Sequence, residues 1–204
     1  MRLSVETPGG VGWIDLERPR GATALLALTH GAGGGVETAD LLAIRSAAVD
    51  AGVAVALITQ PYRVAGRRTP PTPGPQDAAW IALIAALRKR RGLAALPFVV
   101  GGRSNGARVA CRTAVATGAS AVVALAFPLH PPGRPENSRL DELAGAGVPT
   151  LVVQGDRDAF GLPPEGAGRR IVVVAGADHS LKRDPAAVAT AVTSFVVALV
   201  PTGR

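Results

Sequence analysis

The sequence predicts an α/β domain with a doubly wound, mainly parallel β-sheet. Short apolar runs alternate regularly with segments of helical spacing, and these runs are apolar at almost every position. A strand with this composition is covered on both faces, as a parallel strand is between two layers of helices. Alternation of strands and helices calls for right-handed crossovers and a parallel sheet. We expect residues 1–204 to form one domain, because this length suits a single core.

The predicted elements follow the chain in the order that such a sheet requires. An N-terminal hairpin comes first, with strands at Arg2–Glu6 and Val11–Leu16 around Pro8-Gly9-Gly10. The other predicted strands are Thr23–Thr29, Val53–Thr59, Phe98–Gly101, Ala121–Phe127, Thr150–Gln154 and Arg170–Val174. The predicted helices are Glu37–Ala51, Gln76–Arg91 (after a Pro-rich loop, Thr69–Pro75), Asn105–Thr117, a short one around Ser138–Ala144, and Pro185–Val200. The interval between Phe127 and Thr150 has room for one short helix, so we expect no cap domain and an open site.

Composition and charge narrow the classes of protein and partner. Hydrophobic residues make up 48% of the chain and charged residues 18%, which is typical of a globular protein. A net charge of +7 raises the question of nucleic acid, but the basic residues are scattered and aromatic residues make up only 3%. The one tight basic run, Arg88–Arg91, ends a predicted helix, where cations stabilise the free carbonyl groups. We therefore expect no nucleic-acid partner.

The cysteine count and the hydropathy pattern bear on location. Cys111 is the single cysteine, so the chain has no internal disulfide and fits a reducing compartment. The first residues lack the apolar region of a signal peptide. The longest apolar stretch, Ala186–Val200, is short for a membrane span and contains polar residues. These features predict a cytoplasmic protein that is not inserted in a membrane.

A candidate nucleophile stands at a predicted turn between a strand and a helix. The segment Gly102-Arg103-Ser104-Asn105-Gly106 follows the apolar run Pro97–Gly101 and opens the helix Asn105–Thr117. A serine on so tight a turn is held with its Oγ exposed, and the helix N-terminus behind it favours a developing negative charge. The alternative is a serine that only caps the helix in a glycine-rich turn.

A glycine-rich loop, His30–Gly35, follows the first buried strand and would supply backbone N–H donors. The N–H of Ala32, or else that of Gly33, would form an oxyanion hole with the N–H of Asn105 for acyl transfer. His30 is expected to brace this loop. A phosphate-binding loop is the competing interpretation, but the segment lacks the Gly-Lys-Ser/Thr ending and the full Gly-x-Gly-x-x-Gly frame.

A serine nucleophile needs a base, and the base needs a group that orients it. His179 follows the last predicted strand, at the carboxyl edge of the sheet, where ligands bind in such folds. Asp156 and Asp158 follow the penultimate strand and lie between Ser104 and His179 in the chain, which is the order of a Ser-Asp-His triad. Spacing alone does not choose between the two carboxylates. This chemistry requires neither a metal nor an organic cofactor.

Side chains around the candidate triad are expected to contact the substrate. The predicted substrate-binding residues are Arg63, His130 and Phe160. Arg63 shares with Arg67 and Arg68 the loop after the strand Val53–Thr59, which emerges at the same sheet edge. Guanidinium groups there would attract an anionic substrate, the alternative being a solvated loop. His130 either borders the site or is an ordinary loop histidine.

Several sequence blocks occur together in a fixed order. They are His30-Gly31-Ala32-Gly33, Pro61-Tyr62-Arg63, Gly101–Arg108, Phe127–Gly133, Gln154–Asp158 and Asp178-His179-Ser180. With these blocks the chain resembles, over nearly its whole length, the small α/β-hydrolases of the dienelactone-hydrolase-like group. Within that group it is most similar to the branch with the testis-expressed and non-specific-lethal-complex type hydrolase-like domains. The resemblance implies an α/β-hydrolase fold and a serine hydrolase mechanism with Asp158 as the acid. Dienelactone hydrolases generally carry a cysteine nucleophile, so Ser104 argues against dienelactone activity.

These inferences lead to one expected function and one alternative. Ser104, His179 and Asp158 are expected to hydrolyse a small acyl substrate, an ester or a thioester, while the amides of Ala32 and Asn105 hold the oxyanion. The alternative is a catalytically silent protein that uses the same fold as an interaction module, since one fold serves many functions. The sequence leaves the acyl group and the oligomeric state open.

Overall fold

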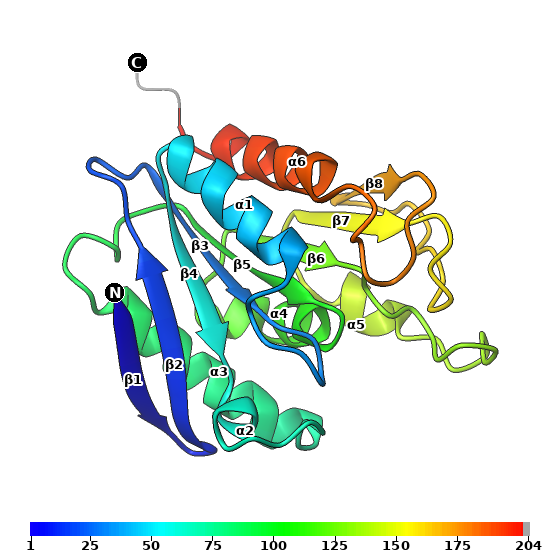
Figure 1. Cartoon of the computed structure of the whole chain (residues 1–204), viewed down its shortest axis with the longest axis horizontal. Coiled ribbons are helices and arrows are strands. Elements are labelled where there is room, and N and C mark those ends of the chain that lie inside the picture. Colours follow the sequence, from blue (N-terminus) through cyan, green and yellow to red (C-terminus); the bar gives the residue numbers. More distant parts are fainter. Residues whose placement is uncertain (202–204) are drawn as a thin grey trace.

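The computed structural model describes residues 1–201 and contains one eight-stranded sheet with helices on both faces (Figure 1). The strands are β1 (Arg2–Thr7), β2 (Gly10–Glu17), β3 (Ala24–Thr29), β4 (Val53–Thr59), β5 (Phe98–Arg103), β6 (Ala121–Leu125), β7 (Thr150–Gly155) and β8 (Arg169–Val174). The helices are α1 (Ala39–Asp50), α2 (Pro61–Val64), α3 (Pro73–Arg88), α4 (Asn105–Thr117), α5 (Leu140–Ala144) and α6 (Pro185–Ala198).

The strand order is β1-β2-β4-β3-β5-β6-β7-β8. The hairpin partners β1 and β2 are antiparallel, as are β2 and β4, whereas every other neighbouring pair in the sheet is parallel. The predicted doubly wound, mainly parallel sheet with an N-terminal hairpin is therefore confirmed. Because its central strands are parallel, the loops after β3, β4, β5, β7 and β8 emerge at one edge of the sheet.

Each central strand contributes side chains to both layers of the core. In β3 every residue is buried, and alternate residues enter different clusters. Leu25 and Ala27 face the layer that contains α3 and α4, whereas Leu26 and Leu28 face the layer that contains α1 and α6. This alternation has the period of two that strand geometry imposes, and it explains why the strands are apolar throughout.

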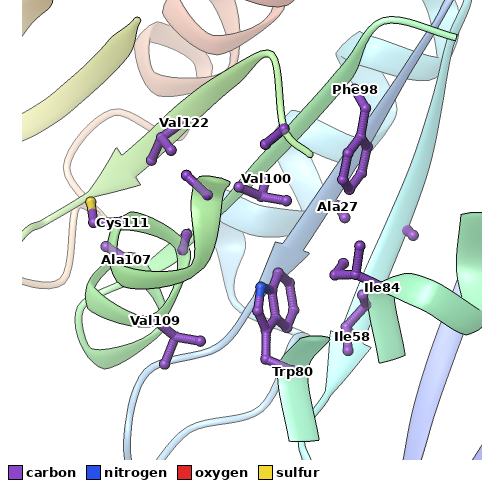
Figure 2. Packing of buried hydrophobic residues seen from close by; sticks show 14 of the residues in the cluster. Ala27, Ile58, Trp80, Ile84, Phe98, Val100, Ala107, Val109, Cys111 and Val122 are labelled. Atoms are coloured by element: carbon purple, nitrogen blue, oxygen red, sulfur yellow. The ribbon is translucent and has the colours of Figure 1, made fainter. Parts of the chain in front are cut away.

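The layer under α3 and α4 holds the largest buried side chains. Trp80 and Ile84 of α3 pack toward Ala27 and Ile58 of the sheet, and Cys111 of α4 lies in the same cluster (Figure 2). On the opposite face, α1 and α6 lie side by side (Figure 1). Helices thus cover the central strands on both faces of the sheet, and the loops at its carboxyl edge are available for a reaction site.

Several elements differ from the predicted ones, and three of these differences have a local reason. α3 begins at Pro73, within the Pro-rich stretch predicted as loop, because a proline is tolerated in the first turn of a helix. A short helix, Pro61–Val64, begins in the same way where a loop was expected. β6 ends at Leu125 and not at Phe127, because Ala126 adopts a φ of 45° that breaks the strand.

The connection from β6 to β7 contains one short helix, α5, and no cap domain, as predicted. None of the described helices combines the length and the apolar character that crossing a bilayer requires.

Helix α4 lies so close to the end of β3 that two positions leave no room for a side chain. A Cβ on Gly106 would stand 2.6 Å from the carbonyl oxygen of His30 and 2.9 Å from that of Thr29. A Cβ on Gly102 would stand 2.6 Å from the carbonyl carbon of Gly106. These obstacles are backbone atoms, so a side chain at either position requires the helix to move away from the sheet.

Gly106→Ala is therefore expected to reduce the free energy of unfolding by about 2 kcal/mol or more, because the added methyl group overpacks a rigid contact. Gly34→Ala is the matched control, since a Cβ at Gly34 meets no atom within 4 Å. The control should stay within about 0.5 kcal/mol of the wild type. Urea unfolding of both variants measures the difference, and equal stabilities would show that the approach of α4 to β3 is not a constraint.

Candidate active site

Ser104 lies on the turn between β5 and α4, at the carboxyl edge of the sheet. It adopts a φ of 53°, a left-handed conformation that is rare for a residue with a side chain and is typical of a serine held on a strand-to-helix elbow. Its N–H donates to the carbonyl of Leu125 over 2.8 Å, which anchors the turn to β6. Its Oγ makes no capping hydrogen bond to α4, so the simple helix-cap interpretation does not describe this serine.

His179, on the loop between β8 and α6, meets the serine hydroxyl. The distance from His179 Nε2 to Ser104 Oγ is 2.9 Å, and that from His179 Nδ1 to Asp158 Oδ2 is 2.8 Å. A carboxylate only accepts hydrogen bonds, so Nδ1 carries a proton and Nε2 is free to accept the serine proton. The side chain of His179 is 23% exposed and that of Asp158 is fully buried. The structure thus connects the three predicted residues in one chain of hydrogen bonds.

The two candidate acids occupy different environments. Asp158 accepts from the N–H of Phe160 over 2.9 Å, in addition to the imidazole of His179. Asp156 is exposed, and its Oδ1 accepts from the N–H of Gly176 over 2.7 Å. His179 is therefore bonded to Asp158, whereas Asp156 holds a turn beside it.

Gln154 supports Asp158 and was missed in the sequence. It is fully buried at the end of β7, and its Nε2 lies 2.7 Å from Asp158 Oδ2. The same nitrogen lies 2.9 Å from the carbonyl of Gly161 and 3.1 Å from that of Phe127. A glutamine that ends an otherwise apolar buried strand is the signal that would have found it, because a buried amide needs partners.

His30 braces the glycine loop, as expected. Its Nδ1 donates to the carbonyl of Gly31 over 2.8 Å, and its Nε2 accepts from the N–H of Gln60 over 3.0 Å. Burial lowers the pKa of His30 to about 4, so the ring is neutral near pH 7 and keeps this pair of bonds. His30 thereby ties the end of β3 to the end of β4.

Tyr62 on α2 is a second support of the loop that sequence reasoning missed. Its hydroxyl donates to the carbonyl of Ala32 over 2.9 Å, and its ring packs edge-on against that of His30 with 5.7 Å between centroids. Burial raises the pKa of Tyr62 to about 12, so the hydroxyl remains a donor.

The candidate oxyanion donors have no competing partner. Within residues 1–201, no backbone acceptor is found for the N–H groups of Ala32, Gly33 or Asn105. The glycine loop lies beside the nucleophile, because a Cβ on Gly31 would stand 3.5 Å from Ser104 Cβ. Free amides next to a serine hydroxyl are the donors that a developing oxyanion requires.

The three predicted substrate-binding residues fall in different places. Phe160 packs on the imidazole of His179, with 4.1 Å between ring centroids. The N–H of His130 donates to the carbonyl of Phe160, and the His130 ring lies against Gly161, so His130 supports the turn that carries Asp158. The structure does not bring His130 into hydrogen-bond contact with Ser104 within the described residues.

Arg63 bonds two backbone carbonyls beside the site. Its Nε donates to the carbonyl of Gly34 over 2.9 Å, and its Nη1 donates to the carbonyl of Arg67 over 2.7 Å. These bonds tie the glycine loop to the segment after α2, so Arg63 supports the loop. Arg68, in contrast, lies next to the loop, with its Nε 3.9 Å from the place of a Cβ on Gly33.

Ser104 and His179 are both half-buried. Surface cavities of about 280–440 Å³ occur elsewhere on the described residues, and neither Ser104 nor His179 lines these cavities. Among the described residues, no three His, Cys, Asp or Glu side chains are grouped as a metal site would require.

Solved structures with the same fold cover 98% or more of the chain. XC6422 from Xanthomonas campestris, described as a serine hydrolase without a lid, is 17% identical and has a TM-score of 0.77, with 100% of this chain and 96% of that chain covered. Est1E from Butyrivibrio proteoclasticus is 17% identical with a TM-score of 0.78, and 98% of each chain is covered. Dienelactone hydrolase from Anabaena variabilis is 19% identical with a TM-score of 0.78, again with 98% of each chain covered.

A comparison with curated proteins finds no match. The family model described as "Alpha/beta hydrolase domain" matches residues 22–196, which include every strand from β3 to β8 and all of the residues joined to Ser104 above. The chain therefore belongs to the α/β-hydrolase family.

Proposed function

We propose that the protein is a serine hydrolase that cleaves a small ester or thioester. The observation that carries this proposal is the hydrogen-bonded chain from Ser104 Oγ to His179, at 2.9 Å, and on to buried Asp158, at 2.8 Å. A serine hydroxyl is a weak nucleophile until a neighbouring base accepts its proton, and both distances lie within the reach that such a transfer needs.

The proposed reaction proceeds through an acyl-enzyme. Ser104 Oγ attacks the substrate carbonyl carbon while His179 Nε2 takes the hydroxyl proton. When the tetrahedral intermediate collapses, the bond to the leaving group breaks and His179 donates its proton to that group. His179 then takes a proton from a water molecule as that water attacks the acyl carbon. It returns this proton to Ser104 Oγ as the bond from Oγ to the acyl carbon breaks and the acid is released. Asp158 holds the imidazole tautomer and stabilises the imidazolium at both steps.

The proposed oxyanion donors are the amides of Ala32 and Asn105, with Gly33 as the alternative to Ala32. A trans peptide points its C=O and its N–H in opposite directions. The Gly31 carbonyl is held by His30, so the N–H of Ala32 in the same peptide is directed away from His30. The Asn105 amide is the first of α4, where the helix N-terminus adds a favourable field for a negative oxygen.

Two finer proposals follow from the sequence. The blocks around His30, Ser104 and His179 support membership of the branch with the testis-expressed and non-specific-lethal-complex type hydrolase-like domains. The single cysteine, Cys111, which is free and buried, supports a cytoplasmic location.

A fluorophosphonate probe distinguishes this function from a catalytically silent interaction module. We expect the wild type to be labelled on Ser104 and to hydrolyse p-nitrophenyl esters or acyl-thioesters. Ser104→Ala and His179→Ala should each abolish nearly all activity with the fold intact, and the double variant should be hardly worse, because the two residues act as one unit. An unlabelled wild type, or losses that add in the double variant, would contradict the assignment.

Asp158→Asn should lose nearly all catalytic activity, whereas Asp156→Asn should lose little of it. The amide at 158 keeps the shape but favours the wrong imidazole tautomer, which costs about 10⁴-fold in kcat in a triad of this kind. In the described structure the side chain of Asp156 bonds only the N–H of Gly176, so its variant serves as the control for a lost carboxylate in the same turn. Steady-state kinetics of both variants decide the point, and the reverse ranking would assign the acid to Asp156.

We further propose that an anionic group on the substrate meets Arg68. Arg68 is exposed and lies beside Gly33, so its charge faces the surroundings of the glycine loop. The guanidinium of Arg63, in contrast, already donates to two backbone carbonyls. A guanidinium beside the glycine loop would hold a carboxylate or phosphate near the reacting carbonyl.

Arg68→Ala should lower kcat/KM for an anionic ester by about threefold and leave a neutral ester of equal size unchanged, because exposed ion pairs contribute little. Added salt should weaken the anionic preference of the wild type, since exposed charges are screened over about 10 Å at 0.1 M. Arg63→Ala is the control for a disturbed loop and should lower kcat/KM for both esters alike. Equal effects of Arg68→Ala on the two esters would remove the proposed role.

A further inference from the structure

Arg103, the residue directly before Ser104, contacts two other segments of the chain. Its Nη2 donates to the backbone carbonyl of His179 over 2.7 Å, and its Nε lies 3.2 Å from Oδ2 of Asp40. The side chain of Arg103 is 17% exposed and that of Asp40 is 1% exposed. A largely buried guanidinium therefore connects the nucleophile elbow to the loop of the base and to α1.

The pair is anchored at α1. Asp40 stands in the first turn of that helix, where its Oδ1 accepts from the N–H of Leu41 over 3.0 Å. A buried carboxylate is costly unless a cation and hydrogen bonds compensate it, and Arg103 supplies the cation. Since α1 packs along α6 and the sheet, Asp40 gives the guanidinium a rigid point of attachment.

The same guanidinium also lies under the glycine loop. Its Nη1 is 3.4 Å from the place of a Cβ on Gly31, in the segment that carries the candidate oxyanion amide of Ala32. One side chain thus adjoins the elbow of the nucleophile, the loop of the base and the loop of the oxyanion donors. Each of these segments leaves a different strand.

We propose that Arg103 is a positioning residue that places His179 relative to Ser104. This inference rests on the proposed function. His179 belongs to an irregular loop, where its ring is supported by Phe160 and Asp158 and its backbone carbonyl is held by Arg103. Arg103 and Ser104 are neighbours in the chain. The hydrogen bond from the Arg103 side chain to the His179 carbonyl therefore joins the loop of the base to the residue next to the nucleophile.

The arrangement requires arginine in particular. The guanidinium is a planar fork whose Nη2 bonds the His179 carbonyl while its Nε lies 3.2 Å from Asp40 Oδ2 in an ion pair. A lysine ammonium is a compact point charge at the end of a flexible stem and holds only one of these partners with good geometry. Arg103→Lys should therefore keep the charge and lose most of the positioning.

The test compares Arg103→Met, Arg103→Lys and Asp40→Asn with a matched control, Arg108→Met. Arg108 stands on α4, is 22% exposed and bonds Glu142 with Nη2 to Oε1 at 2.6 Å, so it is an arginine of similar burial in an ion pair away from the triad. For each variant, kcat and KM are measured on an ester, with the rate of fluorophosphonate labelling and the folded fraction by circular dichroism.

We expect Arg103→Met to lose about 100-fold in kcat per folded molecule, because a misplacement of about 1 Å at the reacting groups has that effect. KM should change by less than about threefold, since uniform binding of the substrate is untouched. Arg103→Lys should lose nearly as much, Asp40→Asn less, and the labelling rate should fall in the same order. Arg108→Met should retain the wild-type kcat.

Two results would overturn the inference. One is an unchanged kcat in Arg103→Lys and Asp40→Asn, which test the pair even if Arg103→Met fails to fold. The other is an equal loss in Arg103 and Arg108 variants, which would reduce the effect to a general loss of stability. Failure of the proposed function has a different signature, namely a wild type that is neither labelled nor active.

Discussion

The strained turn at Ser104 is the constraint on which the rest of the site depends. A residue with a side chain adopts a φ of 53° there only because both flanks are held: the Ser104 N–H by the Leu125 carbonyl, and α4 by its contact with the end of β3. The same contact leaves room only for glycine at 102 and 106. Since the Ser104 amide is used in the turn, the following amide, that of Asn105, is the one left free. Strain of this kind persists only where the surroundings over-determine it.

Burial of charged and polar groups organises the site around that turn. Asp158 and Asp40 are both buried carboxylates: Asp158 accepts from His179 and Gln154, and Asp40 forms an ion pair with the Arg103 guanidinium. Burial keeps His30 neutral and Tyr62 protonated, so the glycine loop is held by groups that do not change charge near pH 7. In the hydrogen-bonded chain from Ser104, the side chain of His179 is 23% exposed and that of Asp158 is fully buried. A buried framework with one accessible base suits proton transfer better than an array of free charges.

The sheet and its hairpin were predictable, because continuous apolar runs mark buried parallel strands. The positions of Ser104, His179 and Asp158 at strand ends were also predictable, because loops after parallel strands emerge at one edge of the sheet. What was not predictable are side chains that bond distant backbone. Arg63, which is expected at the substrate, also bonds the carbonyl of Gly34, and the roles of Gln154, Tyr62 and Arg103 depend on loops that meet only after folding. Such bonds have no period and no fixed spacing. In the sequence, the one sign of such a bond is a buried polar residue within an apolar segment.

A crystal structure of the protein after reaction with a fluorophosphonate tests the proposed nucleophile and oxyanion amides most directly, because the bound phosphonyl group imitates the tetrahedral intermediate. The account predicts a covalent bond from Ser104 Oγ to phosphorus, with the phosphonyl oxygen about 2.7–3.1 Å from the amide nitrogens of Asn105 and of Ala32 or Gly33. An adduct on another side chain, or a phosphonyl oxygen that turns to solvent and bonds neither loop, would contradict it.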